Sequence, residues 1–267
     1  MHAVLALTQI HDSTLNPCYP AAREKLTLSY HWYEAVRLLR QKTSQPLQPS
    51  ERDAVWIAAS LINLGFFAIL EANTPSEAWP LRPPSAFDLS WLNFCDGKRL
   101  VTQWTDPFRK ESHFRDAARE FNKHISTLER LISSPEPDWT SLPDGFYELF
   151  ELSNVSGGSK NPYYAGAVAI AEILRRELCE TNFIPHISFP SILDDRIRAL
   201  LHQKDPRAML LLLYWYAKIC NKRLWWLWKH SWTEGLAICE YLERAWMGQT
   251  ELTRLLVWPR KMLMMAS

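Results

Sequence analysis

Apolar residues recur at three- and four-residue spacing along most of this chain, a pattern that predicts helices and leaves no convincing strand. In the segment of about residues 21–42, Leu26, Tyr30 and Tyr33 fall on one face. The segment of about 51–72 is apolar nearly all round, which predicts a central buried helix. The other predicted helices cover Met1 to Ile10, about 85–102, 112–132, 144–152, 162–179, 191–203 and 205–219, about 224–247, and a short stretch that ends before Pro259.

Capping signals support these boundaries. Asp205 followed by Pro206 is a strong helix start, and Ser85 with Asp88 resembles a capping box. The pair Gly157 and Gly158 makes residues 153–160 the best candidate for a flexible loop. We therefore predict an all-α fold, with about ten helices in one domain over residues 1–267 around an apolar, aromatic-lined pocket.

Composition and charge narrow the class of protein. Hydrophobic residues make up 47% and charged residues 22%, as in an ordinary globular domain, and the net charge of +1 gives no reason to expect direct nucleic-acid binding. The longest apolar run, 209–217, falls far short of the roughly 20 residues of a membrane span. The start of the chain lacks the basic region of a signal peptide. The expectation is a cytoplasmic or nuclear protein that is not secreted.

The sequence gives no pattern for a metal or a cofactor. Five cysteines are scattered along the chain, as expected for reduced, buried thiols, and no histidine has metal-ligand spacing. There is no nucleophile elbow, no phosphate-binding glycine loop and no dinucleotide fingerprint. Asp194 and Asp195 stand without the wider acidic pattern that would hold magnesium for a diphosphate. We therefore expect no cofactor and no metal.

Five stretches of the chain share a resemblance to one family. They are LSYHWYEAVRLL at 28–39, ERDAVWIAASLI at 51–62, EANTPSEAWPLRPPSAFDLSWL at 71–92, DPRAMLLLLYWYAKIC at 205–220 and AICEYLER at 237–244. In this order they resemble the C-terminal ligand-binding domain of fungal sterol-response zinc-cluster transcription regulators. The resemblance implies an α-helical, mostly dimeric module that holds a sterol in a deep apolar pocket, so a homodimer is an expected partner state.

The chain departs from that family in one respect. The six-cysteine zinc cluster that binds DNA in the family has no counterpart before His2. We expect a free-standing protein, in which the pocket itself carries the function.

Aromatic residues point to the wall of such a pocket. Tryptophan is unusually frequent, at 13 residues, and gathers near Trp215 and from Trp225 to Trp232. Core packing or a dimer interface explains this cluster equally well, but a flat, apolar ligand would use the same surface. The predicted ligand-binding residues are Trp56, Phe66, Phe67, Met209, Leu213, Trp215, Trp225 and Trp226.

Three polar residues lie on helices expected to flank the pocket. Tyr30 and His31 can donate a hydrogen bond without carrying charge, and Asn63 needs a partner within a very apolar helix. A structural role is the alternative for each. As catalytic candidates, Tyr30, His31 or Asn63 would donate to a ligand carbonyl.

Two functions from different classes remain open. One is a sterol- or terpenoid-sensing transcription regulator or effector domain without its own DNA-binding module. The other, which the missing zinc cluster favours, is a cofactor-independent cyclase of the pericyclase or Diels-Alderase type in fungal secondary-metabolite biosynthesis, acting on a terpenoid or polyketide. Such an enzyme needs little beyond restraint of the substrate conformer and one hydrogen bond.

Overall fold

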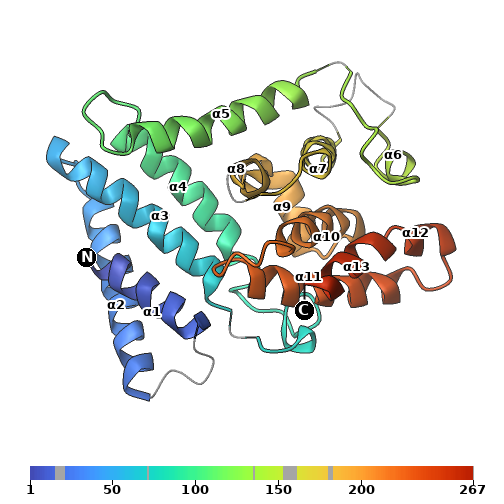
Figure 1. The fold of residues 1–267 in the computed structure, drawn as a ribbon, viewed down its shortest axis with the longest axis horizontal. Helices are drawn as coiled ribbons and strands as arrows, with labels where there is room; N and C mark the ends of the chain where they lie inside the picture. The colour runs from blue at the N-terminus through green and yellow to red at the C-terminus, as the bar shows by residue number, and fades with distance from the viewer. Residues whose placement is uncertain (16–21, 71, 135, 153–160, 180–182, 267) are drawn as a thin grey trace. The chain divides into compact units, whose positions relative to one another are not determined.

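The computed structural model describes residues 1–15, 22–70, 72–134, 136–152, 161–179 and 183–266 (Figure 1). Within these ranges the regular elements are helices and no strand occurs, so the predicted all-α class is confirmed. The loop predicted at 153–160 lies outside the described residues.

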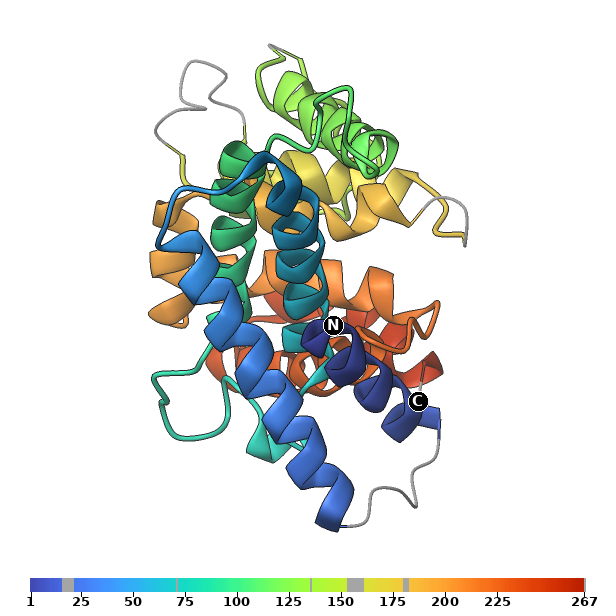
Figure 2. The ribbon, with the colours of Figure 1, turned by 90° about the vertical axis from the view of Figure 1, so that its left-hand side faces the viewer.

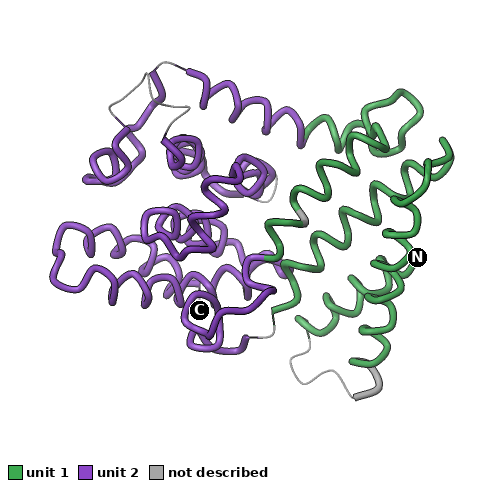
Figure 3. The backbone as a smooth tube through the Cα atoms, turned by 180° about the vertical axis from the view of Figure 1, so that it is seen from behind, with its two compact units in different colours: residues 1–71, 90–120 green, residues 72–89, 121–267 purple. Residues whose placement is uncertain are grey.

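The chain forms two compact units, although its sequence predicts one domain (Figure 3). Unit 1 consists of residues 1–71 and 90–120, and unit 2 consists of residues 72–89 and 121–267. The chain therefore passes from unit 1 to unit 2 at residue 72, returns to unit 1 at residue 90 and enters unit 2 again at residue 121. The long helix α5 (Arg115–Ile132) contains the last of these passages.

Unit 1 is built from four helices, whose blue to green ribbons appear in Figure 2. They are α1 (His2–Leu15), α2 (Ala22–Thr43), α3 (Arg52–Ala68), which follows the short helix η1 (Pro49–Glu51), and α4 (Ser90–Thr105). As the sequence predicts, α3 is central, because it packs against each of the other three. Its core contacts are Ile62 with Ala3 and Ala35 on one side, and Val55 and Ala59 with Val101 on another.

A glycine lets the Trp32 ring lie directly on α3. A Cβ atom at Gly65 would sit 2.3 Å from Trp32 Cζ3 and 2.6 Å from Cη2, distances that no real contact tolerates. Trp32 also packs edge-on against Phe66, with ring centroids 5.0 Å apart. The absence of a side chain at position 65 therefore fixes how closely α2 approaches α3.

Replacing Gly65 by Ala is expected to destabilise unit 1 by about 1–3 kcal/mol, because the indole must move from a packed site. Gly97→Ala in α4 is the matched control, since a Cβ there meets nothing within 4 Å. The control should be neutral or stabilising, because alanine favours a helix over glycine. Urea denaturation of both variants measures the difference, and equal midpoints would contradict the close Trp32 contact.

Unit 2 surrounds one almost fully buried helix, α10 (Pro206–Cys220). Around it pack α7 (Tyr164–Arg175), α8 (Ile184–Ile187), α9 (Asp195–His202), α11 (Trp228–Ala245) and α13 (Val257–Met265). The elements α6 (Phe146–Leu149), α12 (Thr250–Arg254), η2 (Pro75–Glu77) and η4 (Phe189–Ile192) complete the unit. Gly166 of α7 faces Leu211, and the small residues of α7 permit this close approach. The longest apolar run of the sequence, residues 209–217, thus lies at the centre of unit 2.

Two capping predictions had different outcomes. Asp205 is the N-cap of α10 and accepts a hydrogen bond from the Ala208 amide at 2.9 Å, as expected. Asp88 does accept from the Ser85 amide at 2.9 Å, but α4 begins only at Ser90. The predicted start at residue 85 was therefore wrong, because this polar turn closes before the helix begins.

The C-terminal prediction also needs correction. The short helix expected to end before Pro259 is α12, but the next helix, α13, was not predicted, and Pro259 lies in its first turn. Proline is tolerated there because amides of the first turn have no acceptor within the helix. The long helix predicted at about 224–247 is α11, which begins at Trp228, so Trp225 and Trp226 lie in the turn before it.

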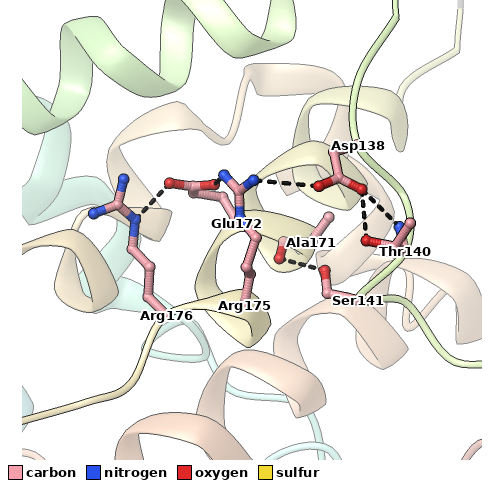
Figure 4. Close-up of polar contacts among 7 residues, drawn as sticks. All are labelled: Asp138, Thr140, Ser141, Ala171, Glu172, Arg175 and Arg176. Carbon is pink, nitrogen blue, oxygen red and sulfur yellow. Dashed lines mark hydrogen bonds and ion pairs between the residues drawn. The ribbon is translucent and has the colours of Figure 1, made fainter.

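Charged side chains tie the 138–141 segment to α7 (Figure 4). Glu172 is buried and accepts hydrogen bonds from both Arg175 and Arg176. Arg175 also reaches Asp138 at 3.2 Å, while Ser141 donates to a backbone carbonyl of α7 at 2.6 Å. The network compensates the buried carboxylate with two guanidinium groups, so a structural role explains it fully.

None of the helices in the described ranges has both the length and the hydropathy that crossing a bilayer requires.

Candidate functional site

The three predicted catalytic residues all lie in unit 1, in two different environments. Tyr30 and His31 are neighbours on α2, with Tyr30 57% exposed. His31 Nδ1 lies 2.9 Å from His2 Nδ1, and the Tyr30 ring meets the His2 ring edge-on at 5.7 Å. The His2 contact could not be predicted from the sequence, because the two histidines are 29 residues apart. The hydrogen-bonding capacity of His31 is therefore partly used by its neighbour.

Asn63 lies on α3 and is the more unusual of the predicted donors. Its side-chain oxygen is shielded from solvent, and no hydrogen-bond donor among the described residues reaches it. A shielded amide oxygen requires a donor, which water or a ligand hydroxyl can supply. The Asn63 oxygen would therefore accept a hydrogen bond from the ligand, whereas the sequence-based hypothesis has Asn63 donate one to a ligand carbonyl. The catalytic roles of Asn63, Tyr30 and His31 stay predictions.

The predicted ligand-binding residues of unit 1 already have protein partners. Trp56 is buried, donates its indole N–H to Thr102 Oγ1 at 3.3 Å and packs against Phe114 with centroids 5.3 Å apart. Phe67 packs against Trp91 at 4.8 Å. Phe66 is the partly buried partner of Trp32 described above. These rings build the core of unit 1, whether or not a ligand also touches them.

The predicted ligand-binding residues of unit 2 divide into core and turn positions. Met209, Leu213 and Trp215 of α10 are at most 1% exposed. Trp225 and Trp226 are half-buried in the turn before α11. Since the predicted cavity would involve α3 of unit 1 as well as α10 and α11 of unit 2, it stays a prediction.

Trp215 is enclosed by neighbours from its own unit. Its indole N–H donates to the His186 carbonyl at 2.6 Å, and its ring stacks on Phe189 at 5.5 Å and on Tyr216 at 5.2 Å. Every polar atom of this side chain is satisfied and two aromatic rings pack on it. The geometry is that of a core residue.

A surface groove in unit 2 has the dimensions of a small-molecule site. It has a volume of about 390 Å³, within the range of ligand pockets, which is roughly 300–1,000 Å³. One wall is the outer face of α13, whose lining residues recur at helical spacing. The lining residues are Glu243 of α11, Thr253 of α12, Leu256, and Val257, Arg260, Lys261 and Met264 of α13.

The groove combines an apolar surface with a charged rim. Val257 and Met264 are 65% and 59% exposed, which is unusual for large apolar side chains, and Leu256 beneath them is buried. Arg260 donates to the Glu243 carboxylate across the groove. Lys261 has no ion-pair partner within the ranges that the structure describes. The lining therefore carries two cations against one anion.

A second polar arrangement lies inside unit 2, between α10 and α11. Glu234 accepts a hydrogen bond from the Tyr216 hydroxyl at 2.8 Å, and His230 Nε2 lies 3.0 Å from the same carboxylate oxygen. All three residues are buried, with at most 5% of each exposed. This Tyr216–Glu234–His230 cluster brings a proton donor, a carboxylate and an imidazole together in a low-dielectric interior, which is a common setting for acid–base chemistry. Sequence reasoning did not find it.

The two core thiols, Cys220 and Cys239, are unsuited to nucleophilic catalysis. Among the described residues, no group of three potential ligands can hold a metal ion, and Cys18 lies outside them. Burial raises the pKa of the Cys220 thiol to about 12 and, helped by Glu243, the pKa of the Cys239 thiol to about 12. Both cysteines of the core are therefore protonated and inert at neutral pH.

This protonation makes the reaction with iodoacetamide strongly dependent on pH and on folding. At pH 8 only about one in 10⁴ of the Cys220 and Cys239 thiols is a thiolate, because their pKa is about 12. Half-buried Cys95 and Cys179 should be alkylated first. Peptide mass spectrometry after timed labelling checks this order, and denaturation in urea should abolish it. Labelling of Cys239 in the folded protein as fast as Cys95 would contradict the burial.

No family model matches the chain, and no curated protein and no solved structure shows significant similarity to it. The relationship to zinc-cluster regulators thus stays a prediction from sequence motifs, and the function must be argued from the groove and the buried cluster.

Proposed function

We propose that this chain binds an apolar small molecule of terpenoid or sterol size in the groove between α11, α12 and α13, and that it acts as a sensing or effector domain. The observation that carries the proposal is the groove itself, a volume of about 390 Å³ with exposed Val257 and Met264 over buried Leu256. Large apolar side chains left in contact with water favour an apolar ligand, because each one that the ligand covers contributes about 1.5–3 kcal/mol.

The open form of the groove favours binding over catalysis. A cyclase that works by conformational restraint has to enclose its substrate and exclude water from it. A groove whose apolar wall residues Val257 and Met264 are more than half exposed does neither. A sensor needs only that the ligand prefers one state of the helices that it touches. Here those helices include α13, which packs on the central α10.

The matched pair Met264→Asp and Met265→Asp tests the site. Met264 lines the groove, whereas Met265 is 67% exposed and does not line it. Ergosterol and the diterpenoid alcohol abietinol serve as probes, with tryptophan fluorescence and native mass spectrometry as readouts. We expect Met264→Asp to weaken binding at least about tenfold, since a carboxylate replaces an apolar contact. Met265→Asp should bind as the wild type does.

Two outcomes would contradict this proposal. If neither probe binds to the wild-type protein below its solubility limit, the groove is not a site for such molecules. If both aspartate variants weaken binding equally, the ligand lies elsewhere. Circular dichroism of both variants separates loss of the site from loss of the fold.

The cofactor-independent cyclase remains a second candidate, and the Tyr216–Glu234–His230 cluster favours it. The Tyr216 hydroxyl donates its one proton to the buried Glu234 carboxylate at 2.8 Å, so in a cyclase it would turn from Glu234 to donate to a substrate carbonyl. The purified protein, without added cofactor, would be incubated with the late polyene intermediate of the pathway encoded beside its gene. If the protein converts the intermediate faster than buffer does, and the Tyr216→Phe variant loses this acceleration, the result supports the enzyme. Ligand binding without conversion supports the sensor.

A further inference from the structure

We propose that the preferred ligand of the α11–α13 groove is a carboxylic acid of terpenoid or sterol size, rather than a neutral alcohol. This inference rests on the proposed function and adds the chemistry of the polar end of the ligand. It starts from the charges in the lining, where Arg260 and Lys261 face the single carboxylate of Glu243.

The first step concerns the Arg260 guanidinium, which is held in place by one ion pair that involves only one of its nitrogen atoms. Glu243 accepts from its Nη1 atom, and this ion pair joins α11 to α13. A guanidinium has five N–H donors in a planar fork, and the described contact uses one nitrogen. The others remain in a geometry that suits a second carboxylate, because planar forks bind carboxylates in a bidentate manner. Glu243 therefore orients a site for a further anion.

The second step concerns the charge balance of the groove. With Glu243 matched to Arg260, the positive charge of Lys261 is uncompensated by the lining. Lys261 lines the same groove as Arg260, so an acid bound there lies within the field of both cations. A neutral hydroxyl gains a hydrogen bond at this position but leaves the charge of the lining at +1, whereas a carboxylate cancels it.

The third step concerns the distance between charged and apolar groups. Val257 precedes Lys261 by one helical turn, and Met264 follows it by one turn, on the same face of α13. One turn is about 5.4 Å, so an apolar skeleton with one acidic end can place that end at Arg260 and Lys261 while its body covers Met264 or Val257. The arrangement fits an amphipathic acid and not an inorganic anion.

Abietic acid and abietinol test the inference, because they share one skeleton and differ only in carboxylate against alcohol. Their binding to the whole chain would be measured by isothermal titration calorimetry at low and high salt. We expect the acid to bind about fivefold to tenfold more tightly, the range that one or two exposed ion pairs supply. The difference should shrink at high salt because the groove is open to solvent.

Variants assign the preference to the named cations. In the double variant Arg260→Gln with Lys261→Gln, the acid and the alcohol should bind alike. Arg254→Gln is the control, since Arg254 is exposed on α12 but does not line the groove. Acetate, as a head group without a skeleton, should not compete.

The outcomes separate this inference from the proposed function. If acid and alcohol bind equally to the wild type and Met264→Asp weakens both, the groove binds ligands but the acid preference is wrong. If neither compound binds, the proposed function itself is wrong. If the acid binds and Met264→Asp changes nothing, the binding is to surface charge alone, and the inference is overturned as well.

Discussion

Replacing Glu234 by Ala is expected to destabilise unit 2 by about 3–5 kcal/mol, one of the two largest effects for a single side chain here. The carboxylate is the common partner of Tyr216 and His230, and all three are buried. Its removal leaves the buried Tyr216 hydroxyl without its acceptor and the buried His230 ring without the carboxylate 3.0 Å from its Nε2 atom, and neither group can reach water without opening the α10–α11 interface. The free energy of unfolding, from urea titration followed by circular dichroism, measures this effect.

A second carboxylate on the same helix provides the control. Glu240 of α11 is 44% exposed in its side chain and pairs with Arg244 one turn later. Glu240→Ala should change stability by less than about 1 kcal/mol, as is usual for exposed pairs. Tyr216→Phe removes one hydroxyl, and its loss in free energy of unfolding should lie between those of Glu234→Ala and Glu240→Ala. Equal unfolding midpoints for Glu234→Ala and Glu240→Ala would show that the cluster contributes no more than a surface pair.

Trp215→Ala is expected to lower the free energy of unfolding by a comparable amount, about 3–5 kcal/mol, because it leaves a cavity in the core. The indole is 1% exposed, stacks on Phe189 and Tyr216, and satisfies its N–H on the His186 carbonyl. Thermal and urea unfolding should both shift markedly. Trp104→Ala on α4 is the control, because this side chain is 50% exposed and removing it opens no interior space.

The Trp215 experiment also bears on the sequence-based hypothesis. A tryptophan in the wall of an open cavity tolerates truncation, because its site is already partly empty. If Trp215→Ala unfolds at the wild-type midpoint, the packing described around it is incomplete, and a role as a ligand wall becomes the better explanation. Global destabilisation supports its place in the core.

The helices were predictable because apolar periodicity and cap residues act locally. Asp205 and Pro206 specify the start of α10 through groups that lie within four residues of one another. Helix α13, with Pro259 in its first turn, was missed for a related reason. Proline ends most helices but also fits the first turn of a new one, and the local sequence does not separate these cases when two short helices follow each other.

The candidate sites were less predictable because their parts come from different helices. His230 and Glu234 are one turn apart in a mostly buried helix, and this spacing alone was a usable signal. Their partner Tyr216 comes from α10, so the cluster appears only when two helices pack. The groove depends on α13, which was not predicted, so the face that carries Val257, Lys261 and Met264 could not be recognised from the sequence.

The alternating path of the chain between the two units sets an order for folding during synthesis. Helix η2 (Pro75–Glu77) belongs to unit 2, and its helical partner there is α11, which begins about 150 residues later at Trp228. At ribosomal rates of about 5–20 residues per second, η2 is made on the order of ten seconds before its partner. Unit 1 can close once residue 120 has emerged, and it then holds both ends of the 72–89 segment while unit 2 is completed. Unit 1 would thus hold the 72–89 segment in place until the rest of unit 2 is synthesised. A ribosome that stalls before residue 228 leaves this segment without its partner helix and exposed to chaperones and proteases.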